Sequence, residues 1–246
     1  MKLMLRALVA TSILSLAACA QAGPSDVSKA EVEEIVRAYL LENPEVIRDA
    51  MIELERRDAE AEVERSRELI ADLSDQLFKD PRDFSIGPRD AKVQLVEFFD
   101  YNCGFCKRST GFMENLIEEY PDDVRVVFKE VPVLTGPEGT SHLAARAALA
   151  AARQGKYRTL HFALMEQRSL TEDRIFEVAE ENGIDVEQLR TDMEDAQIKR
   201  QISDNIELGQ SIPAFTGTPF FVVNDQYVSG ANLVKLDEIL QAELSG

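Results

Sequence analysis

VQLVEFFDYNCGFCKRS, residues 93–109, joins an apolar run to a pair of closely spaced cysteines. The run at 93–99 predicts a buried strand, and residues 107–120 predict a helix. Cys103 and Cys106 therefore fall at a strand-to-helix junction. The N-terminus of a helix carries partial positive charge and free backbone N–H groups, which favour thiolate over thiol at the first cysteine. The pattern predicts a cysteine pair that exchanges thiols and disulfides.

The two cysteines have different expected roles. Cys103 lies at the helix start and is the expected nucleophile, whereas Cys106 lies one turn on and is placed to attack the resulting mixed disulfide. Gly104 and Phe105 between them carry no charge, so the helix dipole alone is expected to favour the thiolate. A C-x-x-C motif at such a junction resembles a thioredoxin-like redox site.

Zinc binding and a packing role in the core are two alternative uses of the cysteines. Structural zinc takes four ligands, usually from a second cysteine pair or two close histidines. The chain has two histidines, His142 and His161, 19 positions apart, so we expect no metal. The cysteines as buried core thiols are the other alternative, and the flanking motifs described below argue against it.

The N-terminus has the pattern of a targeting segment. Lys2 precedes an uncharged stretch of 12 residues at 7–18, and Ala20-Gln21-Ala22 matches a signal peptidase site. This predicts a signal peptide at 1–22. Residues 16–19 also resemble a bacterial lipobox, which predicts a lipoprotein signal at 1–18 and lipidation of Cys19. Both readings remain open, and both predict a periplasmic or secreted bacterial protein in an oxidising compartment, anchored to the membrane in the second case.

The charge of the chain limits its partners. The net charge is −18, and removing Lys2 and Arg6 with the targeting segment gives −18 − 2 = −20. An acidic excess of this size argues against nucleic acid and against an anionic membrane surface as partners.

Residues 23–80 predict a helical arm. Ser28 and Glu31 fit a capping box, and apolar residues then recur at 32, 35, 36 and 39. Asn43 and Pro44 end this helix, and Asn43 is expected to cap a second, highly charged helix from 45 to about 78. Because that helix is too polar for a core, we expect residues 25–78 to form a stalk or an oligomerisation arm. The alternative is a solvated helix lying on the domain.

The remaining residues, 81–246, predict one α/β domain. Residues 79–92 predict a linker with a short edge strand at 84–86, and residues 124–131 predict a second central strand. Four or five helices are expected between 138 and 210: at 142–154, at 159–168, from Thr171 to 182–183, and over 186–208. Strands at 220–223 and 227–228 and a final helix at 232–244 complete the pattern. This order is that of a thioredoxin-like fold with a helical insertion at about 138–210.

Two motifs resemble a known family. VEFFDYNCGFCK (residues 96–107) and GTPFFVVN (residues 217–224) look like the two signatures of DsbA-like thiol:disulfide oxidoreductases, and the resemblance covers residues 82–246. It implies a redox-active disulfide between Cys103 and Cys106, with Cys103 exposed. DsbA itself has Pro-His where this chain has Gly-Phe, so a strongly oxidising pair does not follow. Residues 34–54 resemble the arm of ScsC-like relatives, which implies oligomerisation, and the resemblance predicts a trimer.

Two further positions are expected at the site. Thr218-Pro219 precedes an apolar strand that would normally exclude proline, so we predict a cis bond there, facing the cysteines, with the Thr218 backbone free to pair with a substrate peptide. The alternative is an ordinary turn proline. Glu97, buried in an apolar strand, is expected to carry the proton of Cys106, or else to form a salt bridge with Lys129.

The residues predict an extracytoplasmic enzyme that forms, reduces or isomerises disulfides in cysteine-containing proteins and needs no cofactor. A monomeric oxidase would be reoxidised by a membrane redox partner, whereas an oligomeric isomerase or reductase would be kept reduced, and the arm favours the latter. The alternative class is a peptide-binding chaperone or a Cu(I)-sequestering protein using the same thiolates. His142 and His161 are expected to have packing or capping roles, away from the motif.

Overall fold

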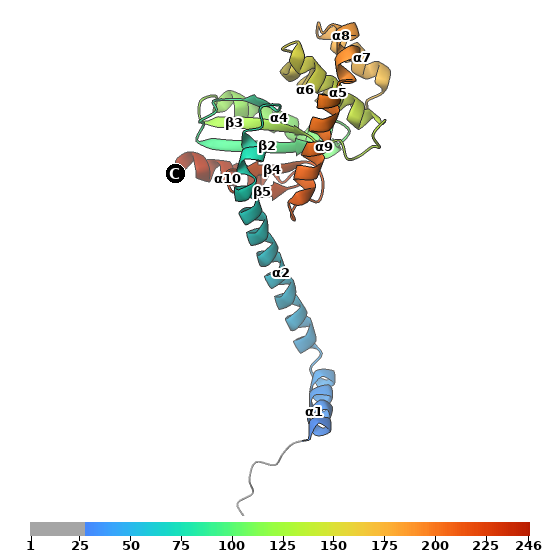
Figure 1. The fold of residues 1–246 in the computed structure, drawn as a ribbon. Helices are drawn as coiled ribbons and strands as arrows, with labels where there is room; N and C mark the ends of the chain where they lie inside the picture. Colours follow the sequence, from blue (N-terminus) through green and yellow to red (C-terminus); the bar gives the residue numbers. More distant parts are fainter. Residues whose placement is uncertain (1–27) are drawn as a thin grey trace, which may run out of the picture. The chain divides into compact units, whose positions relative to one another are not determined.

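The computed structural model describes residues 28–246 (Figure 1). The predicted targeting segment and Cys19 lie outside the described residues. The chain divides into two compact units, residues 1–55 and 56–246, and each is described by itself. Within residues 28–246, no helix has the length and apolar character needed to cross a membrane.

The first unit contains α1 (Lys29–Glu42) and the start of α2 (Glu45–Asp72). The predicted capping box is present, because Glu31 N donates to Ser28 Oγ at 3.4 Å and Ser28 N donates to the Glu31 carboxylate at 2.9 Å. Asn43 differs from the prediction. Its side chain and backbone N–H both donate to Tyr39 O, so it closes α1 rather than starting α2.

The second unit is built on a five-stranded sheet. The strands are β1 (Phe84–Ile86), β2 (Val93–Phe99), β3 (Val124–Glu130), β4 (Phe220–Val223) and β5 (Gln226–Ser229). Their order is β1-β3-β2-β4-β5. β2 and β3 are parallel and are connected by α4 (Gly104–Glu119), whereas the other pairs are antiparallel. The predicted edge strand and both predicted central strands are confirmed.

A block of helices separates β3 from β4. It consists of α5 (Thr140–Arg153), α6 (Tyr157–Met165), α7 (Glu172–Glu181), α8 (Val186–Met193) and α9 (Ala196–Ser211), and α10 (Leu233–Ser245) follows β5. Thr171 Oγ1 accepts a hydrogen bond from Arg174 N and so caps α7 as predicted. In Figure 1, α9 leads from the helical block back to the sheet.

The two faces of the sheet are covered by different elements. Val93, Leu95 and Phe99 of β2 belong to a core shared with α4 and the helical block, whereas Val96 and Phe98 belong to a second core with α9. This alternation follows from the two-residue period of a strand. It places Glu97 on the α4 face, beneath the helix that begins at the cysteines.

The boundary of the predicted arm needs correction. The sequence placed its end at residue 80, but the units divide after Glu55. The long predicted helix also stops at Asp72, and a short helix, α3 (Ser74–Phe78), follows. Ile70 and Leu77 are fully buried in the second core, because they cover a sheet face that would otherwise be exposed. Residues 66–78 are therefore part of the second unit.

Candidate active site

Cys103 is held where the sheet meets a helix. It is the N-cap of α4, its side chain accepts a hydrogen bond from Cys106 N at 3.4 Å, and its own backbone N–H donates to Asp100 O at 3.0 Å. Both Cys103 and Cys106 are free thiols in this structure. The expected exposure of Cys103 is wrong, because its side chain is buried between the helix start and the loop that contains Thr218. The capping position gives the Cys103 sulfur the positive end of the helix dipole, as the sequence predicted.

The two thiols have opposite electrostatic environments. A hydrogen bond from the Cys106 thiol, helped by backbone donors, lowers the pKa of Cys103 to about 6. Burial raises the pKa of Cys106 far above its ordinary range, since its side chain lies fully inside the core. At neutral pH, Cys103 is a thiolate and Cys106 is a protonated thiol. Such a pair can attack a disulfide with one sulfur and hold the other in reserve.

The dipeptide between the cysteines presents one large side chain to solvent. Phe105 is 56% exposed, and the Arg108 guanidinium lies over its ring at 4.2 Å from the centroid. Nothing within 4 Å would meet a Cβ added at Gly104. The Phe105 ring therefore provides an apolar surface beside the cysteine pair.

The segment before β4 faces Cys103. The peptide bond between Thr218 and Pro219 is cis, as predicted, and β4 begins at the next residue. Cys103 Sγ lies 3.2 Å from Thr218 O. The alternative of an ordinary turn proline away from the motif is therefore wrong. The structure brings this loop and the cysteines together from positions 115 residues apart in sequence.

Glu97 lies beneath the cysteines. It is buried, Ser109 Oγ is 3.2 Å from its Oε1, and burial raises its pKa to about 8. The predicted alternative, a salt bridge to Lys129, is wrong. Lys129 is paired in register with Phe98 and forms an ion pair with Asp83 instead, because it points to the opposite face of the sheet from Glu97.

Sequence reasoning missed a carboxylate that organises the loop before Cys103. Asp100 Oδ1 accepts hydrogen bonds from Asn102 N at 2.7 Å and Ser141 Oγ at 2.8 Å, and Oδ2 accepts one from Leu134 N at 2.9 Å. Asp100 thus joins the loop before Cys103 to the segment after β3 and to the start of α5. The D-x-N pattern is the one local signal, since Asp commonly bonds the backbone two residues on.

A buried polar cluster adjoins the same loop. The hydroxyls of Tyr101 and Tyr157 lie 3.1 Å and 2.7 Å from Glu130 Oε1, and Tyr101 also contacts His161 Nδ1 at 3.0 Å. Burial raises the pKa of Glu130 and lowers the pKa of His161 to about 3. The predicted packing role of His161 is confirmed, but it is not remote from the motif, because Tyr101 lies two residues before Cys103.

The other candidate groups fall outside this arrangement. His142 lies on α5 and lines a cavity of about 290 Å³ with Arg146 and Lys199, and its Nδ1 has no hydrogen-bond partner. Among residues 28–246, no group of three or more His, Cys, Asp or Glu side chains is placed to hold a metal ion.

A helix-capping cysteine pair opposite a cis-proline, on a mixed sheet with helices on both faces, defines a thioredoxin-like protein. Residues 94–241 match the family model of the DSBA-like thioredoxin domain. The chain therefore belongs to the DSBA-like thioredoxin domain family. Residues 29–61 also match the model of the copper resistance protein ScsC N-terminal domain.

Solved structures with these features are similar to the chain. A thioredoxin-like oxidoreductase from Silicibacter pomeroyi DSS-3 is 38% identical, with a TM-score of 0.64, over 70% of this chain and 98% of that one. A linker-deletion mutant of Proteus mirabilis ScsC is 27% identical, with a TM-score of 0.66, over 91% and 99%. The thiol-disulfide exchange protein alpha-DsbA2 from Wolbachia pipientis is 26% identical, with a TM-score of 0.67, over 74% and 97%.

The curated relatives are longer proteins. The Na⁺/H⁺ antiporter NhaA of Herminiimonas arsenicoxydans is 29% identical over 161 residues, which cover 65% of this chain. The chain spans 25% of the length of that relative.

Proposed function

We propose that the chain catalyses thiol–disulfide exchange on cysteine-containing proteins in the periplasm or another extracytoplasmic compartment. The observation that carries this proposal is the contrast between the two thiols, with a low pKa at Cys103 and a high one at Cys106. A structural cysteine pair has no need of such a contrast. An exchange enzyme uses it to make one sulfur attack first.

The proposed reaction has two steps. The Cys103 thiolate attacks a substrate disulfide, forms a mixed disulfide and expels one substrate sulfur as a thiolate. Glu97, as a carboxylate, then takes the proton of Cys106, and the Cys106 sulfur attacks Cys103 Sγ. The bond to substrate breaks, the substrate leaves as a thiolate that takes a proton from water, and an enzyme disulfide forms. The substrate is reduced by two electrons, and the enzyme pair is oxidised by two.

Thr218 is the proposed substrate contact. Its carbonyl faces Cys103 at 3.2 Å, so an extended peptide bound there by backbone hydrogen bonds would bring its own sulfur to the cysteine pair. Pro219 fixes this segment at the start of β4. The exposed ring of Phe105, between the two cysteines in sequence, offers an apolar contact to a bound substrate.

The direction we propose is isomerisation or reduction in a homo-oligomer assembled through the N-terminal helices. Its support is the exposed apolar face of α1, together with the match of residues 29–61 to the ScsC N-terminal domain. An isomerase must keep Cys103 reduced, so a membrane redox partner would reduce the enzyme disulfide. An oxidase would need the reverse transfer.

Single-cysteine variants test the proposal. Cys103→Ser is expected to abolish reduction of insulin disulfides, whereas Cys106→Ser is expected to accumulate mixed disulfides with substrate. The rate at which the reduced protein is alkylated should rise with a midpoint near pH 6, the pKa of Cys103, and Cys103 should be labelled first. Preferential labelling of Cys106, or insulin reduction by Cys103→Ser, would contradict the proposed roles.

Copper binding is a second candidate, favoured by the copper resistance protein named in the N-terminal match. Two thiols, one of them a thiolate at neutral pH, are soft ligands suited to Cu(I). Titration of the reduced protein with Cu(I) against a competing chelator, beside scrambled-disulfide refolding, separates the two functions. Tight Cu(I) binding without refolding activity would favour sequestration. Refolding activity in the parent protein that is lost in Cys103→Ser would favour exchange.

A further inference from the structure

Ser109 is a fully buried residue of α4 whose hydroxyl lies between the Glu97 carboxyl group and the Cys106 carbonyl. It lies on the second turn of α4, three residues after Cys106. Its Oγ is 3.2 Å from Glu97 Oε1 and 2.8 Å from Cys106 O. A serine hydroxyl has one hydrogen and two lone pairs, so it can donate to only one of these oxygens at a time.

The protonation state of Glu97 decides which bond forms. When Glu97 is protonated, its O–H donates to Ser109 Oγ, and the serine donates to the Cys106 carbonyl. When Glu97 is a carboxylate, the serine hydrogen turns to Oε1 and stabilises the charge. A buried carboxylate without such a donor is costly, and the hydrogen bond from Ser109 does lower the Glu97 pKa against the larger effect of burial.

We propose that Ser109 is a positioning residue that exchanges its hydrogen bond between Cys106 O and Glu97, and thereby lets Glu97 take the Cys106 proton when substrate is released. This inference rests on the role of Glu97 in the proposed function. Ser109 hydrogen-bonds the Glu97 carboxyl and the Cys106 carbonyl oxygen rather than a sulfur, so it acts through the carboxyl group.

Ser109 donates the side-chain hydrogen bond to the Glu97 carboxyl group, and the other neighbours of Glu97 are apolar or acidic. The adjacent strands place Phe128 and Phe221 in register with it. The titratable groups that act on it or respond to it are the thiols of Cys103 and Cys106 and the phenol of Tyr101. Each of these would raise the Glu97 pKa when charged, so Ser109 opposes them.

Thr110 supplies a matched control. Its Oγ1 donates to the same Cys106 carbonyl at 3.1 Å, whereas the hydrogen bond to the Glu97 carboxyl comes from Ser109. Thr110→Val removes the carbonyl contact of this hydroxyl at nearly constant volume. Ser109→Ala removes both the carbonyl contact and the carboxyl contact. A difference between the two variants therefore reports the bond to Glu97.

The experiment is a two-phase reaction with 5,5′-dithiobis(2-nitrobenzoate), supplied in equal amount to the reduced enzyme. All variants carry Cys19→Ala in the full chain, which leaves Cys103 and Cys106 as its two cysteines. Attack by Cys103 releases one coloured thiolate, and attack by Cys106 on the mixed disulfide releases the second. Both phases are followed from pH 5 to 10, and the second reports the coupled Glu97–Cys106 pair.

We expect Ser109→Ala to leave the first phase unchanged, to slow the second roughly tenfold at pH 7 and to move its midpoint up by about one pH unit. Thr110→Val should match the parent protein, and Ser109→Thr should restore the parent profile. In a Glu97→Gln background, Ser109→Ala should have no further effect. Alanine is the best helix former, so the variant is expected to fold, which circular dichroism checks.

The outcomes distinguish a failure of the role proposed for Glu97 from a failure of the role proposed for Ser109. If Glu97→Gln keeps the parent pH profile, the role of Glu97 in the proposed function is wrong, and the Ser109 inference falls with it. If Glu97→Gln removes the pH dependence but Ser109→Ala matches the parent, only the Ser109 inference is overturned. An equal shift in Thr110→Val would also overturn it, because the carbonyl contact would then be the cause.

Discussion

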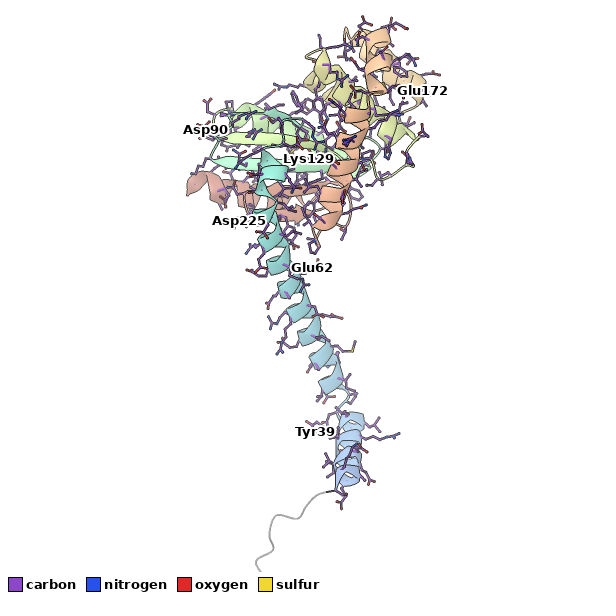
Figure 2. All side chains as sticks on the ribbon, viewed as in Figure 1. Tyr39, Glu62, Asp90, Lys129, Glu172 and Asp225 are labelled. Atoms are coloured by element: carbon purple, nitrogen blue, oxygen red, sulfur yellow. The ribbon has the colours of Figure 1, made fainter. Side chains whose placement is uncertain are left out.

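Two helices of similar length, α1 with 14 residues and α4 with 16, have similar sequence features and opposite environments. Each begins with a side-chain cap and carries an apolar stripe. The stripe of α4 is covered by the sheet, so that Cys106 and Met113 are fully buried. No residue of α1 is buried within its unit, and Ile35 and Leu41 are 63% and 72% exposed. Tyr39 projects from the same helix (Figure 2).

The difference shows what each pattern determines. Caps and 3.6-residue periodicity are enough to define a helix, but its chemistry depends on what covers it. Burial on the covered face of α4 raises the pKa of the Cys106 thiol, whereas hydrogen bonds at the start of the helix lower the pKa of the Cys103 thiol. The stripe of α1 at 32, 35, 36 and 39 is an apolar face without a partner inside its own unit, which supports the proposed self-association.

The largest expected effect comes from a pair of truncations that test where the two regions divide. Deletion of residues 25–55 should leave a folded, redox-active monomer. Deletion of residues 25–78 should prevent folding, because it also removes Ile70, Leu77 and Phe78 from the second core. Each such loss costs about 2–5 kcal/mol, and the total approaches the whole stability of a domain, about 5–15 kcal/mol. Thermal unfolding and insulin reduction measure both. Cooperative unfolding of the longer deletion would place residues 66–78 outside the core.

A charge on the exposed stripe should break the proposed oligomer. Ile35→Lys buries an unpaired ammonium if α1 self-associates, and we expect the protein to sediment as a monomer at micromolar concentration. Glu34→Lys adds the same group on the opposite side of α1 and serves as the control. Catalysis of insulin reduction should persist in both variants. A parent protein that sediments as a monomer would contradict the proposed assembly.

Two glutamates should respond to pH in opposite directions. Burial raises the pKa of Glu97 from 4.5 to about 8, so the folded state keeps a proton that the unfolded state has released. The parent therefore loses stability relative to Glu97→Gln as pH rises from 4.5 to 8, at up to about 1.4 kcal/mol per pH unit. Denaturant unfolding across this range measures the difference, and parallel curves for the two proteins would contradict it.

Glu31 in α1 has the opposite sign. Hydrogen bonds from Ser28 lower its pKa, so its contribution to the helix is present above pH 4.5 and is lost as pH falls through the lowered pKa. Glu31→Gln should remove a decrease in α1 helicity on acidification. Amide exchange in residues 28–42 measures it, and identical exchange in both proteins at neutral and acidic pH would contradict the role of the carboxylate.

Local signals predicted much of the fold and the centre of the site. The β2–α4 junction, the Thr171 cap and the cis bond before β4 each depend on neighbouring residues, and each was predicted. The break at Leu73 and the Asp100–Ser141 contact, 41 residues apart, depend on tertiary packing that no window of sequence contains. The prediction for Asn43 was wrong for a related reason, since the same side chain can cap the helix before it or the helix after it.

The smallest expected effect compares one kind of cap in the two regions. Thr171→Ala removes the side-chain bond at the start of α7, whose residues Ile175 and Ala179 lie in the main core. Loss of a cap costs about 1 kcal/mol, which should lower the Tm of the domain by about 2–4 °C. Ser28→Ala removes the matching bond in α1, where no residue is buried within the unit. It should leave that transition in place and accelerate amide exchange only near residue 31, because fraying of α1 uncovers no core. An equal drop in Tm for both variants would mean that α1 unfolds together with the domain, and the contrast between the two helices would then be one of exposure alone.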